Sequence, residues 1–443
     1  MAFTELNLNN PLLNALQDMG YQTPTTIQYK TFAKAMSGTD VCGIAQTGTG
    51  KTVAYLLPLL RQWKFTKDVS PSMLILVPTR ELVQQVVETI HQLTAYMNVV
   101  AVGVYGGVNI NTQKLSVQQK VDIVVATPGR LFDLAMNGSL KLKLVKKLVI
   151  DEVDEMLNLG FRTQLKNILD LLPEKRQNLM FSATITEEVE QLMEIYFTNP
   201  ERIEAAPTGT PLKNIQQFAY AVPNFYTKVN LLQLLLAEDV SMNKVLIFVD
   251  SKALADQLFE QLLPTYDGVA NVIHSNKEQN HRFNTVKQFK AGVYRFIIAT
   301  DIVARGIDVA EVTHVINFDM PAVPENYMHR IGRTGRADKP GIAISFITPA
   351  EKTEQESIEA LMNYNIPMLE LPAHLEISTQ LTADEQPKVY MKEIQLKIPK
   401  KEERGASFHE KSAKNSKVNV VVRRKDRMMK KYGKPKTRGQ KKK

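Results

Sequence analysis

One stretch constrains the fold of this chain more than any other: Ala45-Gln46-Thr47-Gly48-Thr49-Gly50-Lys51-Thr52. It follows a short apolar run, Val41 to Ile44, and precedes a run with helical spacing of apolar residues, Val53 to Leu60. A strand, a glycine-bearing loop and a helix start, in that order, are the context of a phosphate-binding loop. The stretch therefore predicts an α/β fold with a phosphate site at the end of one strand.

The residue types in this loop suit phosphate and magnesium. Gly48 and Gly50 allow successive backbone N–H groups to point into one hollow, and the following helix adds its own N–H groups and the positive end of its dipole. Lys51 can reach the terminal phosphates, and the Thr52 hydroxyl can ligate Mg²⁺. The usual pattern opens with glycine, whereas this chain has Ala45. The alternative interpretation is a glycine-rich turn that binds nothing.

Short apolar runs, which we expect to be buried parallel strands, alternate with helical patterns along the first half of the chain. The runs are Val41–Ile44, Met73–Val77, Val100–Val104, Asp122–Val125, Leu148–Ile150 and Asn178–Phe181. A compact polar or glycine-bearing group follows each run; these groups are Ala45–Thr52, Pro78–Arg80, Gly106–Gly107, Thr127–Arg130, Asp151–Asp154 and Ser182–Thr184. In open α/β sheets ligands bind beyond the carboxyl ends of the strands, so we expect these groups along one edge.

Two acids at the end of a strand carry the strongest chemical signal after the phosphate loop. Asp151 and Glu152 directly follow the apolar run that ends at Ile150. Adjacent acids are common on surfaces, but unpaired charge beside a buried strand is costly and therefore favours a function. Asp151 can hold Mg²⁺, and Glu152 can orient and deprotonate an attacking water.

A base pocket is the functional interpretation of the segment before the phosphate loop. The aromatic ring of Tyr21 can stack on a purine, and the amide of Gln28 can pair with the N6/N7 edge of adenine. The alternative is a helix-capping turn with a surface amide.

A second α/β domain follows a segment rich in small residues, Pro and Gly near Ala205–Pro211, which we interpret as a linker. Its apolar runs are Val245–Val249, Val272–His274, Arg295–Ala299, His314–Phe318 and Ile342–Ile347. This half has no glycine-rich phosphate loop of its own. It carries Arg330, Arg333 and Arg336, spaced by three and interleaved with Gly, which suits a loop that directs guanidinium groups at phosphate. The alternative is a solvated basic helix face.

The net charge of +9 is unevenly distributed. Residues 388–443 hold 21 Lys and Arg against 5 Asp and Glu, whereas the preceding 387 residues hold 34 against 41. This basic tail, with Tyr390, Phe408 and Tyr432 as interspersed aromatics, predicts a disordered arm that binds an anionic polymer, most often nucleic acid. The alternative is a solubilising tail without a partner.

The bulk properties indicate a globular protein of two to three domains without a membrane span. The first eleven residues lack a basic region followed by an apolar one, so we expect no secretory signal. A single cysteine, Cys42, excludes an internal disulfide and fits a reducing, cytoplasmic location. We expect Cys42 to be a buried strand residue.

Taken together and in order, these motifs resemble the DEAD-box ATP-dependent RNA helicases. The resemblance covers about residues 3–370 and leaves out the tail. It depends on Gln28, AQTGTGKT (45–52), PTREL (78–82), GG (106–107), TPGR (127–130), DEVD (151–154), SAT (182–184), ATDIVARGID (299–308) and HRIGRTGR (329–336).

The resemblance implies two tandem RecA-like domains with mostly parallel sheets, which close together on ATP, Mg²⁺ and RNA. We expect the domains at 1–206 and 214–371, a linker at 207–213 and a basic, largely flexible extension at 372–443. By the same resemblance, Tyr21 and Gln28 select adenine and residues 45–52 bind phosphate, with Thr52 and Asp151 as the magnesium ligands.

The remaining site residues are also carried over from the family. Glu152 is the expected general base, Asp308 a ribose contact, and Arg333 and Arg336 arginine fingers. Ser182 and Thr184 are expected to couple ATP to RNA through Asp154 and His329. The expected RNA contacts are Thr79, Arg80, Gly107, Thr127, Arg130, Gln279, Arg282, Thr300 and Arg305.

Two motif positions depart from the family. Val153 stands where Ala is usual, and because it removes no ligand we expect activity to survive. Ser275 and Asn276 stand where Gly-Asp is usual, so no RNA contact is carried over to them.

The rival function is an ATP-gated RNA clamp or assembly scaffold that unwinds little. Ribosomal or other ribonucleoprotein partners in ribosome assembly, mRNA decay or cold adaptation are all compatible with the sequence.

Overall fold

The computed structural model describes residues 2–46, 48–204, 214–301, 312–335, 340–386 and 423–433. The chain forms two compact units, Met1–Gln386 and Pro387–Lys443. Within the second unit the described part contains one helix, α16 (Arg424–Tyr432). Four predicted site residues lie outside the described residues: Thr47, Arg305, Asp308 and Arg336. Across the described ranges, we find no helix with the length and apolar character of a membrane span.

The first domain is built on a sheet of seven parallel strands in the order β3-β4-β2-β5-β6-β1-β7. The strands are β1 (Val41–Ile44), β2 (Met73–Leu76), β3 (Ala101–Val104), β4 (Ile123–Ala126), β5 (Lys147–Ile150), β6 (Gln177–Ser182) and β7 (Glu201–Glu204). Because every neighbouring pair is parallel, the carboxyl ends of all seven strands meet at one edge.

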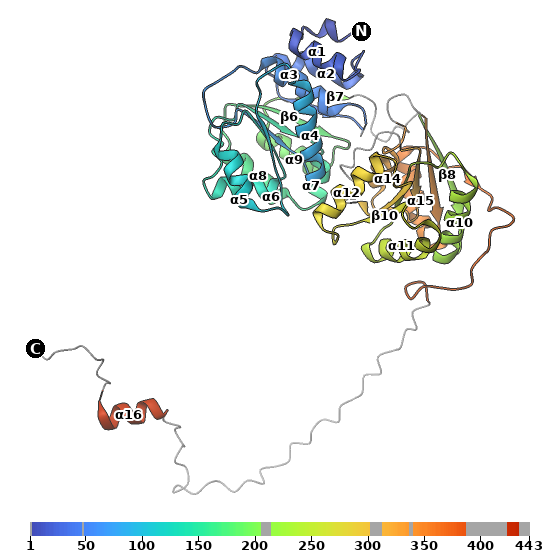
Figure 1. Ribbon diagram of the computed structural model, residues 1–443. Helices are drawn as coiled ribbons and strands as arrows, with labels where there is room; N and C mark the ends of the chain where they lie inside the picture. Colours follow the sequence, from blue (N-terminus) through green and yellow to red (C-terminus); the bar gives the residue numbers. More distant parts are fainter. Residues whose placement is uncertain are drawn as a thin grey trace, which may run out of the picture. The chain divides into compact units, whose positions relative to one another are not determined.

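Helices cover both faces of this sheet (Figure 1). One face packs against the 3-10 helix η1 (Phe3–Leu6) and against α1 (Asn10–Asp18), α2 (Thr26–Met36), α3 (Lys51–Gln62) and α4 (Arg80–Leu93). The other face packs against α5 (Ile110–Gln118), α6 (Pro128–Met136), α7 (Val153–Asn158), α8 (Arg162–Leu171) and α9 (Glu187–Tyr196). Successive strand residues therefore enter opposite cores, as Val41 and Cys42 do.

The six strands predicted in this half are all present, because each is a short apolar run, and all but the edge strand β3 are largely buried on both faces. The sequence did not predict the seventh strand, β7. Its residues Glu201 and Glu204 are charged and Ile203 is its one buried apolar residue. An edge strand with a single buried side chain carries too weak a hydrophobic pattern to be recognised from sequence.

The second domain repeats the strand order of the first. Its seven parallel strands lie in the order β10-β11-β9-β12-β13-β8-β14, which is the first order with each strand number raised by seven. The strands are β8 (Ile215–Ala221), β9 (Val245–Phe248), β10 (Ala270–Ile273), β11 (Phe296–Ala299), β12 (His314–Asn317), β13 (Gly341–Ile347) and β14 (Met368–Leu369). The predicted α/β class with two tandem parallel-sheet domains is confirmed.

Helices again lie on both faces of the second sheet. The two that pack on one face are α10 (Phe225–Glu238) and α11 (Lys252–Tyr266). Those on the other face are α12 (Gln279–Lys290), α14 (Pro324–Ile331) and α15 (Lys352–Met362), the last preceded by the 3-10 helix η2 (Pro349–Glu351). Residues 372–386, which the sequence assigned to the extension, belong to the first compact unit.

Gly43 shows how closely β1 and β6 pack. A Cβ atom at this position would lie 2.5 Å from the ring of Phe181, which itself packs on the ring of Tyr55 with centroids 5.4 Å apart. Both rings are fully buried and have no room to retreat.

We therefore expect Gly43→Ala to lower the free energy of unfolding of the first domain by about 1–3 kcal/mol, the usual cost of overpacking a core. Urea denaturation followed by far-UV circular dichroism measures this change. Gly106→Ala is the matched control, because nothing lies within 4 Å of a Cβ at that position. Equal midpoints for the two variants would contradict the packing argument.

Candidate active site

The strand order gathers the predicted loops into two neighbouring groups. The loops after β5, β6 and β1 lie side by side and contain Asp151–Asp154, Ser182–Thr184 and the phosphate-type loop. The loops after β3, β4 and β2 lie side by side next to them and contain Gly106–Gly107, Thr127–Arg130 and Pro78–Arg80. One half of the edge thus holds the residues suited to phosphate, and the other half holds those suited to nucleic acid.

The loop between β1 and α3 has the geometry of an anion cradle. Gly48 and Gly50 have φ angles of 82° and 86°, a left-handed conformation that favours glycine. Thr49 Oγ1 donates to the carbonyl of Gln46 at 2.8 Å and closes the turn. Ala45 needs no such freedom, because its N–H donates to Ser182 O at 3.0 Å and continues the β1–β6 ladder.

Lys51 is the first residue of α3 and is buried. Within the described part of the chain its Nζ atom has no hydrogen-bond partner. A buried ammonium without a partner is costly unless an anion joins it. The site is therefore built for a negatively charged ligand.

Gln28 caps α2, as the alternative interpretation of this segment expected, and it is buried and also contacts the phosphate-type loop, which the sequence did not indicate. Its Nε2 donates to Gly50 O at 3.2 Å, and its Oε1 accepts from Thr25 N at 2.9 Å. Thr25 Oγ1 in turn donates to Thr49 O at 2.9 Å. The amide thus braces the phosphate-type loop against the start of α2, and Tyr21 lies 46% exposed in the segment just before.

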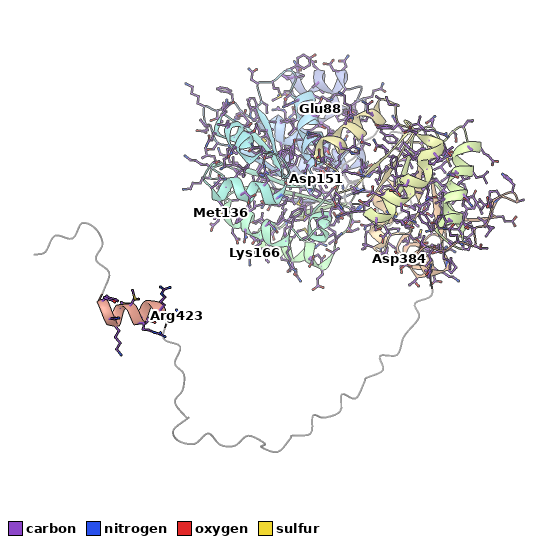
Figure 2. The ribbon with its side chains drawn as sticks, turned by 60° about the horizontal axis from the view of Figure 1, so that its bottom comes forward. Glu88, Met136, Asp151, Lys166, Asp384 and Arg423 are labelled. Carbon is purple, nitrogen blue, oxygen red and sulfur yellow. The ribbon has the colours of Figure 1, made fainter. Side chains whose placement is uncertain are left out.

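Asp151 and Glu152 are both buried at the end of β5, and Figure 2 labels the position of Asp151. Burial, with a smaller contribution from the Glu152 charge, raises the pKa of Asp151 to about 6 against the opposing effect of the Lys51 charge. Glu152 adopts a left-handed backbone with φ 51° and ψ 51°, uncommon for a residue other than glycine. In the described structure its Oε2 has no hydrogen-bond partner. Strained backbone and an unsatisfied buried carboxylate oxygen mark a functional position.

Asp154 ties the loop after β5 to the loop after β6. Its Oδ2 accepts from Ala183 N at 3.0 Å, from Thr184 N at 2.9 Å and from Thr184 Oγ1 at 3.0 Å. Its Oδ1 accepts from Glu155 N at 3.1 Å. Ser182 does not take part through its side chain, since its buried Oγ has no partner among the described residues.

His329 contacts Glu155 rather than Asp154. Its Nδ1 lies 2.5 Å from Glu155 Oε1, and both side chains are buried. Burial lowers the pKa of His329, but the bond to Glu155 and the charges of Glu155, Asp154 and Glu152 outweigh burial and raise it. Val153, the departure from the family pattern, packs fully buried in the core on this side of the sheet.

Arg80 lies against Gly107, and the two predicted RNA contacts therefore share one place. A Cβ atom at residue 107 would lie 2.0 Å from Arg80 Nη1, and Gly107 has a φ of 80°. Thr79 caps α4 by accepting from Leu82 N at 3.3 Å. Only glycine leaves the space in which the guanidinium lies.

Arg130 lies against the segment after Gly107. Its Nη1 donates to Gln113 Oε1 at 2.7 Å and its Nη2 to Val108 O at 3.0 Å. Thr127 is the N-cap residue of α6 and is buried. The bonds hold the guanidinium near the ends of β3 and β4.

Gln279 and Arg282, on α12, meet residues at the start of α4. Gln279 Oε1 accepts from Arg80 Nη1 at 2.6 Å, and Gln279 Nε2 donates to Glu81 at 3.2 Å. Arg282 forms a buried ion pair with Glu81. Burial lowers the pKa of Arg282, and the charge of Glu81 opposes this shift.

Thr300 and Arg333 lie at the second sheet. Thr300 is buried at the end of β11. Arg333 is buried after α14, and its Nε donates to His329 O at 3.1 Å. Arg330 is fully buried, and its Nε and Nη2 donate to the two carboxylate oxygens of Asp301 at 2.5 and 2.8 Å.

Two residues with central contacts, Glu81 and Glu155, were not among the predicted site residues, and Arg330, which the sequence directed at phosphate, instead pairs with Asp301. Glu81 belongs to the PTREL stretch and Glu155 follows DEVD, so both stood next to recognised motifs. Nothing in the sequence indicated that Glu81 and Glu155 are buried, because both are charged residues on helices. Their low exposure, 8% and 1%, is a property of tertiary packing.

The residues at this edge fit ATP with Mg²⁺. The observation that tests the fit is the orphaned ammonium of Lys51 beside the buried carboxylate of Asp151. Asp151 and Thr52 offer oxygen, which Mg²⁺ prefers. No group of three or more His, Cys, Asp or Glu in the described ranges could hold a metal by itself. Mg²⁺ commonly binds through one or two carboxylates together with substrate phosphates.

Comparison with known proteins agrees with this geometry. The family model described as DEAD/DEAH box helicase matches residues 25–192, and the helicase conserved C-terminal domain matches residues 227–338. The DEAD-box ATP-dependent RNA helicase CshA of Bacillus cereus is 39% identical over 371 residues, 84% of this chain and 70% of that protein. The ATP-dependent RNA helicase DbpA of Bacillus subtilis is 38% identical over 378 residues, 85% of this chain and 78% of that protein.

A solved structure shares the fold. Dbp5 of S. cerevisiae, bound to RNA and ADP BeF3, superposes with a TM-score of 0.76 at 28% identity. The match covers 84% of this chain and 95% of Dbp5.

The contact between His329 and Glu155 predicts a pH dependence. Because the pKa of His329 is raised by folding, its contribution to stability is fully present below the ordinary pKa of about 6.5 and is lost as pH rises through the folded value. We expect His329→Gln to lower the free energy of unfolding at pH 6, with the difference shrinking toward pH 9.

Urea denaturation of the ligand-free proteins at several pH values measures this difference. His91→Gln is the control, because His91 is exposed on α4. A His329 effect that stays constant with pH would mean that the charged imidazolium is not what stabilises the contact.

Proposed function

This chain belongs to the DEAD/DEAH box helicase family, and from that membership we propose that it is an RNA-dependent ATPase that separates short RNA duplexes locally. The relatives CshA and DbpA are ATP-dependent RNA helicases. The observation that carries the proposal is the buried Lys51, whose Nζ has no hydrogen-bond partner among the described residues, on the same edge of the sheet as loops suited to nucleic acid.

ATP binds with its phosphates in the hollow between β1 and α3. Residues 45–52 hold the phosphates with the backbone N–H groups that follow Ala45 and with the start of α3, and Lys51 neutralises the terminal phosphates. Tyr21 and Gln28 recognise the adenine, and Asp308 the ribose. Gln28 then has two tasks, because it also braces the phosphate loop through Gly50.

Thr52 and Asp151 hold Mg²⁺, which neutralises phosphate charge. The unsatisfied Oε2 of Glu152 accepts the proton of the attacking water. Arg333 and Arg336 stabilise the charge that develops on the γ-phosphate, a contribution worth about 10³–10⁵ in rate in related NTPases.

Asp154 and His329 carry the coupling between ATP and RNA. Asp154 holds the loop at Ser182–Thr184 through three hydrogen bonds, and the neighbouring Glu155 holds His329. The side chain of Thr184, rather than that of Ser182, makes the contact that supports this role. Any shift of the loop after β5 on ATP binding is then passed to β6 and to α14.

Single-stranded RNA binds along the other half of the edge through its sugar-phosphate backbone, so little sequence preference is expected. The residues we assign to it are Thr79, Arg80, Gly107, Thr127, Arg130, Gln279, Arg282, Thr300 and Arg305. In the ligand-free protein Arg282 is paired with Glu81 and Arg80 with Gln279, so RNA has to replace these contacts.

ATPase rates with and without single-stranded RNA test the proposal. We expect RNA to accelerate hydrolysis, and DNA to do so less because it lacks the 2′-hydroxyl. Equal rates with and without RNA would refute the coupling. The rival function, an ATP-gated clamp that unwinds little, is distinguished by displacement of a short tailed RNA duplex.

The domain limits and surroundings are also proposals. We place the first domain at 1–206 and the linker at 207–213, which lies outside the described residues. We place the second domain at 214–386 rather than ending it at 371, because residues 372–386 belong to the same compact unit. A cytoplasmic location fits the bacterial relatives, and structured ribosomal or other ribonucleoprotein RNA is the class of partner that a local unwinding activity would serve.

Replacing the proposed general base tests the chemistry. Glu152→Gln keeps the size of the side chain and removes its capacity to accept a proton, so we expect kcat to fall about 10²–10⁴-fold while ATP and RNA binding persist. Glu88→Gln, on the exposed side of α4, is the control (Figure 2). Turnover near the wild-type rate would remove Glu152 from this role.

Deleting residues 387–443 tests the basic tail. This segment carries 21 Lys and Arg against 5 Asp and Glu, so its contacts with RNA are ionic and displace counterions. We expect the deletion to weaken RNA binding strongly at about 50 mM salt and little at several hundred millimolar. Fluorescence anisotropy across a salt series measures it. Unchanged affinity at every salt concentration would leave solubilisation as the role of the tail.

A further inference from the structure

The second sheet has the same strand order as the first. At the position that corresponds to the phosphate loop, however, side chains of the protein itself supply the charges. Strand β8 stands where β1 stands in the first sheet, and α10 follows β8 as α3 follows β1. In place of a glycine-rich loop the chain has Val222-Pro223-Asn224. Asn224 caps α10 with its side chain, accepting from Thr227 N at 2.9 Å.

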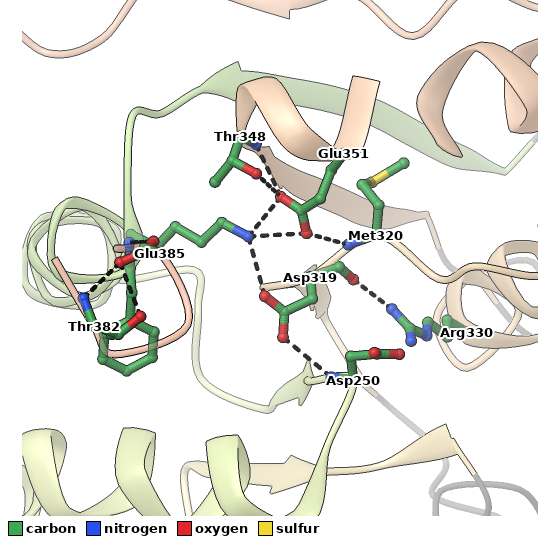
Figure 3. A network of polar contacts seen from close by, with 10 residues as sticks. Asp250, Asp319, Met320, Arg330, Thr348, Glu351, Thr382 and Glu385 are labelled. Carbon is green, nitrogen blue, oxygen red and sulfur yellow. Dashed lines mark hydrogen bonds and ion pairs between the residues drawn. The ribbon is translucent and has the colours of Figure 1, made fainter. Parts of the chain in front are cut away.

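A buried lysine lies near the start of α10, as Lys51 does in α3, yet this one is paired (Figure 3). Lys228 Nζ lies 3.1 Å from Asp319 Oδ1 and 2.8 Å from Glu351 Oε2. Asp319 lies in the loop after β12, one residue further along than Asp151 lies after β5. The lysine and the aspartate of this position therefore neutralise each other.

Asp319 and Glu351 pass the contact on to two further elements. Glu351 accepts from Met320 N at 3.0 Å, which ties η2 to the segment after β12. Asp319 O accepts from Arg330 Nη1 at 2.6 Å. Arg330 is fully buried on α14, the helix that carries His329 and leads into Arg333. A continuous set of polar contacts thus runs from α10 to α14.

The other end of this network is held by residues 372–386, which we call the strap. Its Ser378 lies against the start of α10: Asn224 Nδ2 donates to Ser378 O at 2.6 Å, and Ser378 N donates to Thr227 Oγ1 at 3.1 Å. Leu375 packs against the core under α10. The side chain of Asn230, one turn further on, donates to Glu376 O at 2.9 Å.

Glu385 of the strap places a carboxylate at the positive end of α10. Its Oε1 accepts from Phe225 N at 2.6 Å, and its Oε2 accepts from Thr382 N at 2.9 Å. Such a charge stabilises the N-terminus of a helix by complementing its dipole. The strap thereby supplies to α10 the negative charge that a phosphate would supply to α3.

We propose that the strap is a working part of the second domain: it holds α10 and, through Lys228, Asp319 and Arg330, positions α14. Lys228 and Glu385 are then positioning residues, since neither contacts a reacting group. The consequence for catalysis follows from the proposed function, in which His329 on this helix couples ATP to RNA and Arg333, just after the helix, acts on bound ATP. The basic tail, in contrast, begins only after Gln386.

Glu385→Ala in the full chain tests this proposal, because it removes the carboxylate and leaves the basic tail in place. At saturating ATP and RNA we expect kcat to fall about tenfold, with KM for RNA unchanged. His374→Ala is the matched control, since among the described residues this exposed strap residue pairs with Glu238 alone. A loss that appears in KM alone, or equally in His374→Ala, would overturn the proposal.

Hydrogen exchange of the same proteins without ATP or RNA gives a readout that does not depend on the proposed function. We expect Glu385→Ala to exchange faster at the first turn of α10 and also at residues 329–333. Faster exchange at α10 with no change at α14 would overturn the positioning claim even where kcat falls. If full-length protein shows no RNA-stimulated ATPase, the proposed function fails while exchange at α14 still decides the strap.

A milder variant guards against loss of folding. Thr382→Val removes the hydroxyl that donates to Glu385 Oε2 at 3.1 Å and retains the carboxylate. We expect faster exchange at α10 and α14 in the same order but by a smaller factor than in Glu385→Ala. Exchange identical to the wild type at both helices would count against the strap.

Discussion

One buried carboxylate, Asp154, joins the loop after β5 to the loop after β6 in the candidate site. It accepts three hydrogen bonds from Ala183 and Thr184 and a fourth from Glu155 N, so the loops after β5 and β6 move together. Hydrogen bonds to an ionised acceptor are about twice as strong as neutral ones, and breaking this set would leave several donors unsatisfied. The phosphate half and the coupling contact of Glu155 with His329 both depend on this connection.

Two domains with the same strand order use the same positions in opposite ways. In the first domain Lys51 is buried, and its Nζ has no hydrogen-bond partner in the described ranges, so an anion has to complete it. In the second domain Lys228 is buried between Asp319 and Glu351, and the strap covers the helix start with Glu385. A buried charge without a partner favours the binding of an oppositely charged ligand, whereas a buried charge paired within the protein holds its own elements together. The difference explains how one architecture serves ligand binding in one half and positioning in the other.

Much of this could be predicted, and the misses have physical causes. Central parallel strands are buried on both faces and stand out as apolar runs, whereas the edge strand β7 buries only Ile203 and β14 has two residues. Glycines with positive φ, such as Gly50, and acids after strands were recognisable because their chemistry is local. Glu81, Glu155 and the bracing role of Gln28 were not, because each depends on a partner distant in sequence or brought near by folding.

By itself the sequence determined which elements form and which residues carry chemistry, since hydrophobic period, glycine and charge are read locally. The tertiary structure decided their neighbours. The loops run in the order 45, 78, 106, 127, 151, 182 along the chain, but their strands lie in the order β3-β4-β2-β5-β6-β1. That order separates the phosphate residues from the nucleic-acid residues and places the loop after β5, which contains Asp154, at the boundary between them. It follows from crossover connections that bury both faces of a parallel sheet, a constraint that no short stretch of sequence contains.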